Sequence, residues 1–514
     1  MTMNSTRRDI LKLAGTGIVL ASFLKGTAAS AADADTVTIA YNVNLPAWDP
    51  TVGPSAVNPT IQAIYRSVFD QYVGQKPDLS FEPGLLTGWG WNDDKTKVWM
   101  EVREDVSWHD GSPFTAEDVV WSLERAGDPA TGNPIQFVWS TIGNFTIDGN
   151  RIEADVKSYE PTLFKWMAFL TGYVMPKAYF EKVGAEGFER APIGTGPYKV
   201  DEFQSNGFLR LKANEAYWGG KPAFDTVIFK FVPDASSRVA EIESGGSDVT
   251  LEIPYEEYDR LTKAGGFSGT AEPISDIGMI FINDVEPLLD KNVRLAAHHA
   301  INKQAIIDRL LSGYGVPIDT LEAPEYLAYD PSITVAYDPD MAIKLLADSG
   351  FSPDNPVKVT IQTTRGFKPK DYEMIQAIVG MWRKVGIEAE IEVYEIAKHY
   401  ELRANDQLAP FAFYNWGNAI GDPTTSTGFA MFGPSPHSVW DTDDLDAQIG
   451  PLWNEKDEDK RIAGWKAVSR TIADNGYVIP LLQYVQPIVF RDGLSVVPNG
   501  SGALQATLVA PAKA

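Results

Sequence analysis

The hydrophobic pattern of the chain predicts strands and helices in mixed order. Residues 36–42 alternate between apolar and polar side chains like a half-buried strand, and residues 54–70 carry apolar side chains at helical spacing. Residues 99–106 are strand-like again, and Thr115 has the position and chemistry of a helix cap. This mixture of elements indicates an α/β protein.

A strand, helix, strand unit is predicted between residues 357 and 393. Residues 357–362 are β-like, residues 371–385 place their large apolar side chains on one helical face, and Gly386 ends the helix. Residues 387–393 then alternate apolar side chains with glutamates. Such units close as right-handed crossovers between parallel strands.

The N-terminus has the pattern of an export signal. Adjacent Arg7 and Arg8 precede a short, moderately apolar stretch over residues 13–24 and the small-residue site Ala29-Ser30-Ala31. We therefore predict that residues 1–32 are a twin-arginine signal peptide, read by the twin-arginine translocase of a Gram-negative bacterium. The alternative, the first amphipathic helix of a cytosolic protein, is disfavoured by the glycines in this stretch, and the stretch is too short to span a bilayer.

Composition narrows the class of protein further. The chain has no cysteine, so it has neither a disulfide nor the residue that would anchor an exported protein through a lipid. The formal charge is -25, and removal of residues 1–32, with four basic and one acidic side chain, makes it -28. Such a charge argues against nucleic-acid and anionic-lipid partners. We expect a soluble periplasmic monomer.

The signatures of several enzyme classes are missing from the sequence. It contains no Gly-x-Ser-x-Gly elbow, no His-Glu-x-x-His motif, no Walker phosphate loop and no cysteine nucleophile. Adjacent His298 and His299 would point about 100° apart on a helix, so they do not suit one metal ion. We predict no catalytic residue, no metal and no cofactor. A secreted carbohydrate-active enzyme with a carboxylate pair in an aromatic cleft stays open as the alternative.

Several extended motifs resemble one family. The chain is similar to periplasmic solute-binding proteins of ABC transporters, family 5, the oligopeptide, dipeptide and nickel-binding class. The order and spacing of the motifs hold from about Thr36 to the C-terminus. The motifs are residues 106–125, 192–199, 214–222, 233–238 and 293–303.

This resemblance implies a two-lobed α/β periplasmic binding protein, type II-like and of cluster C, with an extra inserted domain. Domain I would comprise residues 33–75, 190–278 and 487–514; domain II residues 76–189; and domain III residues 279–486. A ligand would be held between domains I and III by hinge closure and passed to an inner-membrane ABC permease. The predicted function is capture of a peptide or another small organic solute, such as an opine or an oligosaccharide, without chemistry.

The segment after residues 410–413 is predicted to form a wall of the ligand site. It follows a strand-like stretch, ends in a Gly-Asp-Pro turn, and combines flat apolar surface with orienting amides, as binding sites do. Asp422 is expected to hold the turn. The predicted ligand contacts in this wall are Tyr414, Asn415, Trp416 and Asn418.

Two further positions bear on the charge of the ligand. In dipeptide-binding relatives a similar stretch carries an aspartate for the peptide ammonium, and the matching position here is Ala419. A buried ammonium without a counter-charge is costly, so we expect no obligatory ammonium at this position. Arg365 matches the arginine with which those relatives hold the ligand carboxylate, and a guanidinium suits that task.

Five more residues complete the predicted ligand site. Asn44, Trp48 and Asp49 follow the first strand, at the carboxyl end where α/β proteins form ligand sites. Trp440 and Tyr484 are aromatic candidates. Core or turn roles are the alternative for all five.

Overall fold

The computed structural model describes residues 35–435 and 438–513. The predicted twin-arginine signal lies outside these residues. Within the described ranges, no helix is long and apolar enough to cross a membrane.

A mixed sheet of eleven strands forms the centre of the described chain. Ten strands follow the order β15-β14-β16-β12-β17-β11-β1-β10-β9-β8, and β13 pairs separately with β17. The strands are β1 (Thr36–Tyr41), β8 (Tyr198–Gln204), β9 (Phe208–Ala213), β10 (Thr226–Phe231), β11 (Val249–Leu251), β12 (Phe267–Ile282), β13 (Val316–Pro317), β14 (Val357–Thr363), β15 (Ile387–Val393), β16 (Phe411–Gly417) and β17 (Val478–Arg491).

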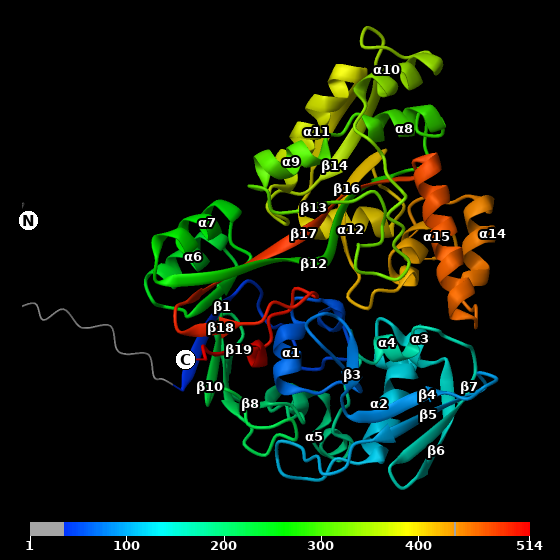
Figure 1. The fold of residues 1–514 in the computed structure, drawn as a ribbon. Coiled ribbons are helices and arrows are strands. Elements are labelled where there is room, and N and C mark those ends of the chain that lie inside the picture. The colour runs from blue at the N-terminus through cyan, green and yellow to red at the C-terminus, as the bar shows by residue number, and fades with distance from the viewer. Residues whose placement is uncertain (1–34, 436–437, 514) are drawn as a thin grey trace, which may run out of the picture. The chain divides into compact units, whose positions relative to one another are not determined.

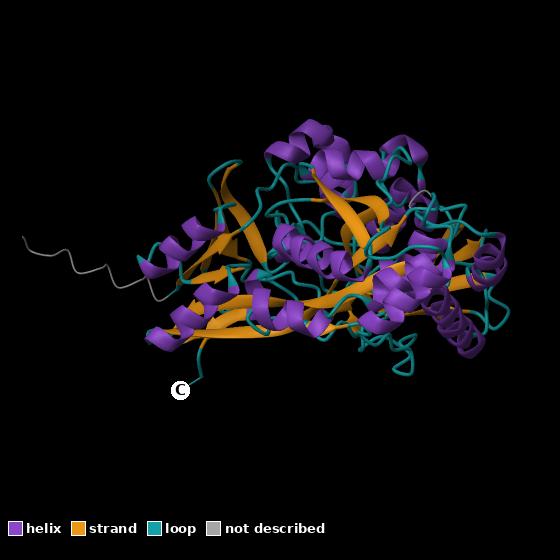
Figure 2. Cartoon of the chain, turned by 90° about the horizontal axis from the view of Figure 1, so that it is seen from above, coloured by secondary structure: helices purple, strands orange, loops and turns teal. Residues whose placement is uncertain are grey.

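The two long strands β12 and β17 connect the two halves of this sheet. They run antiparallel from the pair Phe267 and Arg491 to the pair Phe281 and Val478, and Figure 1 shows them extending from the region of α6 and α7 towards that of α11. Nearly every residue of β17 is buried, as expected for a strand covered on both faces. Figure 2 shows helices to both sides of the long strands.

Smaller sheets and fifteen α-helices complete the fold of the described residues. Strands β4 (Leu86–Trp91), β5 (Lys97–Val102), β7 (Arg151–Val156) and β6 (Ile142–Asp148) form a four-stranded sheet, and β2 (Val73–Gln75) pairs with β3 (Phe81–Pro83), as β18 (Leu494–Val496) does with β19 (Val509–Pro511). The helices are α1 (Gln62–Val68), α2 (Ala116–Gly127), α3 (Gln136–Trp139), α4 (Leu163–Trp166), α5 (Lys177–Arg190), α6 (Ala235–Glu243), α7 (Tyr255–Ala264), α8 (Lys291–His299), α9 (Lys303–Leu310), α10 (Pro339–Asp348), α11 (Asp371–Val385), α12 (Ile396–Ala404), α13 (Thr427–Met431), α14 (Asp443–Leu452) and α15 (Glu458–Asn475).

Two local predictions are confirmed closely. Strands β14 and β15 are parallel, with Val357 opposite Ile387, and they flank α11. Gly386 ends α11 with φ 107°, a conformation that favours glycine. Thr115 caps α2 in a reciprocal capping box with Asp118.

Two predicted elements were too long. The helix expected over residues 54–70 is divided into a 3₁₀ helix (Pro54–Val57) and α1, because Asn58 precedes a proline and takes an extended conformation. The strand expected over residues 99–106 ends at Val102, and Asp105 has φ 60°, which is incompatible with a strand.

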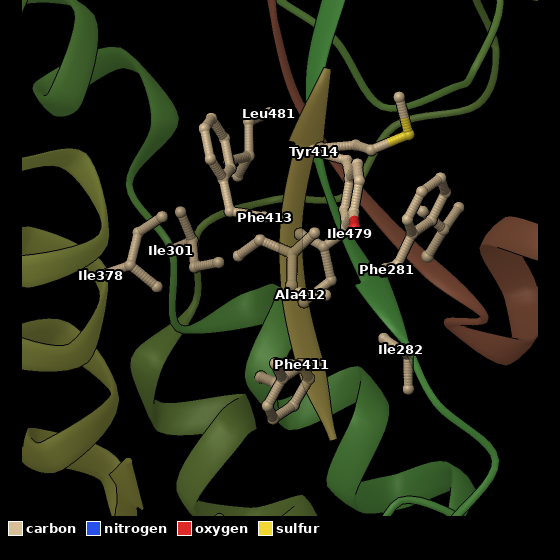
Figure 3. Close-up of a cluster of buried hydrophobic side chains, with 14 of the residues drawn as sticks. Phe281, Ile282, Ile301, Ile378, Phe411, Ala412, Phe413, Tyr414, Ile479 and Leu481 are labelled. Atoms are coloured by element: carbon tan, nitrogen blue, oxygen red, sulfur yellow. The ribbon is translucent and has the colours of Figure 1, made fainter. Parts of the chain in front are cut away.

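Three large hydrophobic clusters stabilise the described chain. The first surrounds β12, β14, β16 and the first half of β17; Figure 3 shows Phe413 on one side of β16 and Tyr414 on the other. The second packs around β1, β8 to β11 and the end of β17. The third lies around β4 to β7 and α2, and Ala419 and Ile420 from the loop after β16 also belong to it. The domain limits given above stay a prediction.

Candidate functional site

The motifs at residues 106–125 and 192–199 meet in a structural contact. The Nδ1 atom of His109 accepts a hydrogen bond from the Gly194 amide at 3.1 Å, and its Nε2 lies 3.0 Å from the Gly196 carbonyl oxygen. Burial lowers the pKa of His109 to about 4, so the ring is neutral and donates from Nε2. These residues hold two loops together.

Arg238, from the motif at residues 233–238, holds the end of β11. It is 3% exposed, and its guanidinium donates to the carbonyls of Leu251 at 3.0 Å and Glu252 at 2.6 Å. Two further bonds reach the carbonyls of Val232 and Pro233. This clamp fixes Glu252 at φ 52°, a left-handed conformation that costs about 1 kcal/mol or more in a residue other than glycine.

Several polar side chains form a row across β17 and its neighbouring strands. One end of this row lies at Glu252, directly after β11. Strands β1 and β11 are parallel neighbours, and Asn42 and Glu252 follow their carboxyl ends, where α/β proteins form ligand sites. The Asn42 amide donates to the Glu252 carboxylate. The Gln486 amide approaches the same carboxylate at 3.5 Å and donates to the Gly502 carbonyl at 2.9 Å.

The other end of the row lies at Asp276 on β12. Its carboxylate accepts from the Lys368 ammonium at 2.5 Å and from the Asn415 amide at 2.9 Å. Burial by itself lowers the pKa of Lys368, but attraction by Asp276 and then by Glu252 outweighs it and raises the pKa. Lys368 thus lies within electrostatic reach of both ends of the row.

Tyr484 on β17 lies between these two ends. Its ring centroid is 5.5 Å from the Lys368 Nζ, and it shares one face of β17 with Gln486 because successive strand residues alternate. Opposite Tyr484 the pairing of β12 with β17 shifts register between Pro273 and Ile277. A β-bulge changes the direction of the side chains in it and is common next to binding sites. Asp276 belongs to this bulge.

The hydroxyl of Tyr484 has no hydrogen-bond partner among the described residues, although the side chain is only 3% exposed. Burial raises the pKa of Tyr484 well above its ordinary value, so the hydroxyl stays protonated. We call the whole row the polar stripe; its members are Asn42, Glu252, Gln486, Tyr484, Lys368, Asp276 and Asn415.

A small cavity borders the stripe at Lys368 and Asn415. Its volume of about 10 Å³ has room for one water molecule. Phe367 and Tyr400, which also line it, are exposed to 44% and 37%, unusually high values for such side chains. Two partly exposed aromatic side chains, Phe367 and Tyr400, therefore lie beside the stripe at Lys368.

Of the four residues predicted on the wall after residue 410, Asn415 belongs to the stripe. Tyr414 is buried, and its ring stacks on His399 with centroids 4.0 Å apart. Trp416 is half-buried, and its indole donates to the Thr425 carbonyl at 2.6 Å. Asn418 is 4% exposed and ties the following turn by donating to the Asp422 carbonyl at 3.0 Å.

The role predicted for Asp422 is confirmed. Its fully buried carboxylate accepts from both terminal nitrogens of Arg461 and from Lys165, and it caps the 3₁₀ helix Pro423–Thr425. The neighbouring Ala419 is 2% exposed, and its carbonyl accepts from the Gln75 amide at 2.6 Å.

The other six predicted ligand residues differ in exposure and in their contacts. Arg365 is exposed, with its guanidinium 3.9 Å from the centre of the Tyr372 ring, and half-buried Asn44 donates to Asn206 at 3.2 Å. Tyr484 lies in the stripe, as described. Three others make core or loop contacts: Trp48 with Phe203, Asp49 with Arg125 and Trp440 with Arg294.

Sequence reasoning missed most of the stripe, namely Asn42, Glu252, Asp276, Lys368 and Gln486. One signal was available: Glu252 and Asp276 are acids that interrupt apolar stretches. Among the described residues, no group of three or more histidine or acidic side chains is arranged to hold a metal ion.

The fold and this site together have the features of an α/β binding protein. Residues 80–435 match the family described as "Bacterial extracellular solute-binding proteins, family 5 Middle". The chain belongs to this family, and the predicted fold class, the two-lobed α/β periplasmic binding protein, is confirmed.

Individual relatives agree with this assignment. The chain is 27% identical to the dipeptide-binding protein of Escherichia coli (strain K12) over 444 residues, 80% of this chain and 81% of that protein. It is similar to the dipeptide-binding protein of Pseudoalteromonas sp. SM9913, solved with Met-Leu, at TM-score 0.79 and 19% identity, covering 93% and 100% of the two chains. It is also similar to MoaA from A. tumefacien, solved with mannopinic acid, at TM-score 0.75 and 24% identity, covering 93% and 99%.

Members of this family are binding proteins rather than enzymes. The chain is accordingly a substrate-binding component of an ABC importer, as predicted.

Proposed function

We propose that this protein captures a small organic solute against the polar stripe and delivers it to an inner-membrane ABC permease. The solute is a peptide or a compound of similar size, such as an opine or an oligosaccharide. Capture takes place by hinge closure between domains I and III, which brings the end of β11 and the loop after β14 together around the solute. The protein carries out no reaction on it.

The observation that carries this proposal is the buried, unpartnered hydroxyl of Tyr484 in the stripe. A buried hydroxyl without a partner costs about 1–3 kcal/mol, and a solute held against the stripe would supply the missing hydrogen bond. The stripe crosses β12 and β17, the only two strands that link the halves of the main sheet among the described residues. Closure about these strands would enclose it.

The ligand's anionic end is assigned to Arg365. Its guanidinium is exposed and lies over the Tyr372 ring, 3.9 Å from the ring centre, and a guanidinium can clamp a carboxylate through two parallel bonds. Trp416 and Asn44, both half-buried, are proposed as further contacts. The relatives that bind a dipeptide and mannopinic acid support a ligand of this size with a carboxylate.

The location follows from the family and the N-terminal pattern. Export through the twin-arginine translocase would deliver a folded monomer to the periplasm of a Gram-negative bacterium. The acidic composition favours solubility there.

The test begins with protein purified from its periplasmic extract. Mass spectrometry identifies the retained solute, calorimetry measures its affinity, and small-angle scattering compares the free and bound protein. We expect one solute to bind with a decrease in radius of gyration. Failure of every recovered solute to bind, with unchanged scattering, contradicts the proposal.

Arg365→Ala locates the anionic end. It should weaken binding of a carboxylate-bearing solute roughly 10-fold or more, because a charge-assisted pair is lost. Arg151→Ala is the matched control, since Arg151 is a partly exposed arginine paired with Glu101 in the four-stranded sheet. Equal affinity of both variants would show that Arg365 is not a ligand contact.

A further inference from the structure

The loop after β16 is buried in a hydrophobic cluster that a distant part of the chain forms. Ala419 and Ile420 of this loop belong to the third hydrophobic cluster, and every other buried member of that cluster comes from residues 72–174. Strand β16, which leads into the loop, belongs instead to the first cluster and to predicted domain III. The loop therefore connects the β16 part of the molecule to the part that contains the four-stranded sheet.

Hydrogen bonds from its own part of the molecule fix the shape of this loop. The Tyr326 hydroxyl donates to the Asn418 carbonyl at 2.5 Å, and the Asn418 amide donates to the Asp422 carbonyl at 3.0 Å. Arg461 on α15 holds the Asp422 carboxylate with two bonds. All of these residues lie in predicted domain III, so the loop can keep its shape when nothing is docked against it.

The polar groups that receive the loop come from the other part. The Gln75 amide donates to the Ala419 carbonyl at 2.6 Å, and the Gln75 oxygen accepts from Arg66 at 3.1 Å. Because Arg66 holds this oxygen, the NH₂ group of Gln75 is directed towards the loop. The Lys165 ammonium, on α4, lies 2.8 Å from the Asp422 carboxylate. Two surfaces that are already ordered lose little conformational entropy when they dock.

The ion pair between Lys165 and Asp422 can open without leaving a buried charge unpaired. Among the described residues, Asp422 pairs with Arg461 from its own part and with Lys165 from the other. The Lys165 side chain is 22% exposed, whereas Arg461 and Asp422 are fully buried. When the two parts separate, Lys165 becomes hydrated and Asp422 keeps Arg461 as its counter-charge. The large penalty for breaking a buried pair is thus avoided.

Two outer contacts join the same two parts. The rings of Phe137 on α3 and Phe429 on α13 meet edge to face, with centroids 6.3 Å apart. The Lys456 ammonium donates to the Asp94 carbonyl at 3.0 Å. Phe137, Lys456 and Asp94 are exposed, so each contact contributes little by itself and can form and break readily.

We propose that the loop Asn418–Asp422 is a latch that keeps the protein closed when no solute is bound. This inference rests on the proposed hinge closure and adds its regulation: the closed form is the main form of the free protein, and a solute enters during a minor opening. Ala419 and Ile420 supply the apolar contact of the latch. Gln75 and Lys165 supply its polar contacts.

The experiment measures the free protein, so it does not depend on the identity of the solute. The whole mature protein is freed of retained solute by unfolding in guanidinium chloride and refolding. Because the chain has no cysteine, nitroxide labels can be attached specifically to Asp93→Cys and Asp459→Cys. Both positions are exposed and lie beside the contact of Lys456 with Asp94. Electron paramagnetic resonance then gives the ratio of short, closed label distances to long, open ones.

The free labelled protein should show mainly the short distance. Ile420→Ala removes buried apolar contact, and Lys165→Gln removes the ion pair between the two parts. The two substitutions together should lower the ratio of short to long distances roughly 10-fold or more. A merely structural role of these residues would change the unfolding temperature but not this ratio.

Two single variants keep the test valid if the double variant folds poorly. Lys165→Gln alone leaves Asp422 paired with Arg461, so the fold is retained and the ratio should fall several-fold. Lys97→Gln is the matched control, because Lys97 pairs with Asp155 inside the four-stranded sheet. This control should leave the ratio of label distances unchanged.

The outcomes distinguish the latch from the import function. Mainly long distances in the free labelled protein overturn the latch, because its contacts would then need a solute to form. Short distances alone in every variant also overturn it, since the loop would be permanent packing, and so does an equal shift in the control. None of these results affects the import function. A protein whose latch variants open but which binds no recovered solute keeps the latch and loses the import function.

Discussion

Replacing Asp422 with asparagine should destabilise the protein strongly, because this carboxylate is the centre of a buried charge network. It is fully buried, and both terminal nitrogens of Arg461 donate to it at 2.9 and 2.5 Å, while Lys165 approaches at 2.8 Å. Arg461 is itself fully buried. The substitution keeps the shape of the side chain but leaves the guanidinium with only the longer pair to the exposed Glu458 carboxylate, at 3.8 Å.

The expected loss is about 3–5 kcal/mol in the free energy of unfolding, the usual effect of removing one partner of a buried ion pair. Burial alone would raise the pKa of Asp422, but Lys165 and Arg461 outweigh burial and hold the pKa well below its ordinary value. The stabilisation is therefore complete above about pH 4, the pKa of an unfolded aspartate, and decreases as the pH falls towards the folded-state pKa. Asp422→Asn should lack this acid dependence.

Urea unfolding at pH 7, followed by tryptophan fluorescence, measures the effect. The control is Asp155→Asn, which removes an exposed pair with Lys97 and should cost less than about 1 kcal/mol. A cost for Asp422→Asn no larger than that of the control would refute the reasoning. The loop after β16 would then be held by its apolar contacts alone.

Three further predictions concern stability. Burial raises the pKa of Glu322 to about 7, so between about pH 4.5 and 7 the native state keeps a proton that the unfolded state releases. The unfolding temperature should therefore fall as the pH rises through this range. Glu322→Gln should remove this pH dependence of the unfolding temperature, and an unchanged pH dependence would contradict the raised pKa of Glu322. Gly386→Ala should destabilise the protein by about 1–3 kcal/mol, because φ is 107° and the new Cβ would lie 2.8 Å from the Ser352 carbonyl carbon. Gly380 is exposed within α11 and has open space around it, so Gly380→Ala should stabilise the protein by about 0.5–1 kcal/mol. Thermal unfolding that ranks these two variants in the opposite order would count against this account of α11. Thr115→Ala should cost about 1 kcal/mol by removing the cap of α2, and urea unfolding indistinguishable from wild type would disprove the cap's contribution.

Elements with a strong local pattern could be predicted from the sequence. The unit β14, α11 and β15 depends on apolar periodicity and on Gly386, and both signals lie within one stretch of chain. The helix at residues 54–70 was predicted too long because a single proline after Asn58 overrides the periodicity there.

The candidate site could be predicted only in part, because its contacts are remote in sequence. Asn42 and Glu252 are 210 residues apart, and Lys368 and Asp276 are 92 residues apart. Spacing cannot indicate such pairs, and the bulge that includes Asp276 depends on the pairing of β12 with β17. Tyr484 was foreseen as an aromatic candidate, but its unpartnered hydroxyl is visible only in three dimensions.

A crystal structure of the protein with the solute that it retains on purification tests the central claim most directly. The account predicts that the solute lies against the polar stripe, within hydrogen-bond distance of the Tyr484 hydroxyl. A solute bound elsewhere, with Tyr484 still lacking a partner, would contradict it.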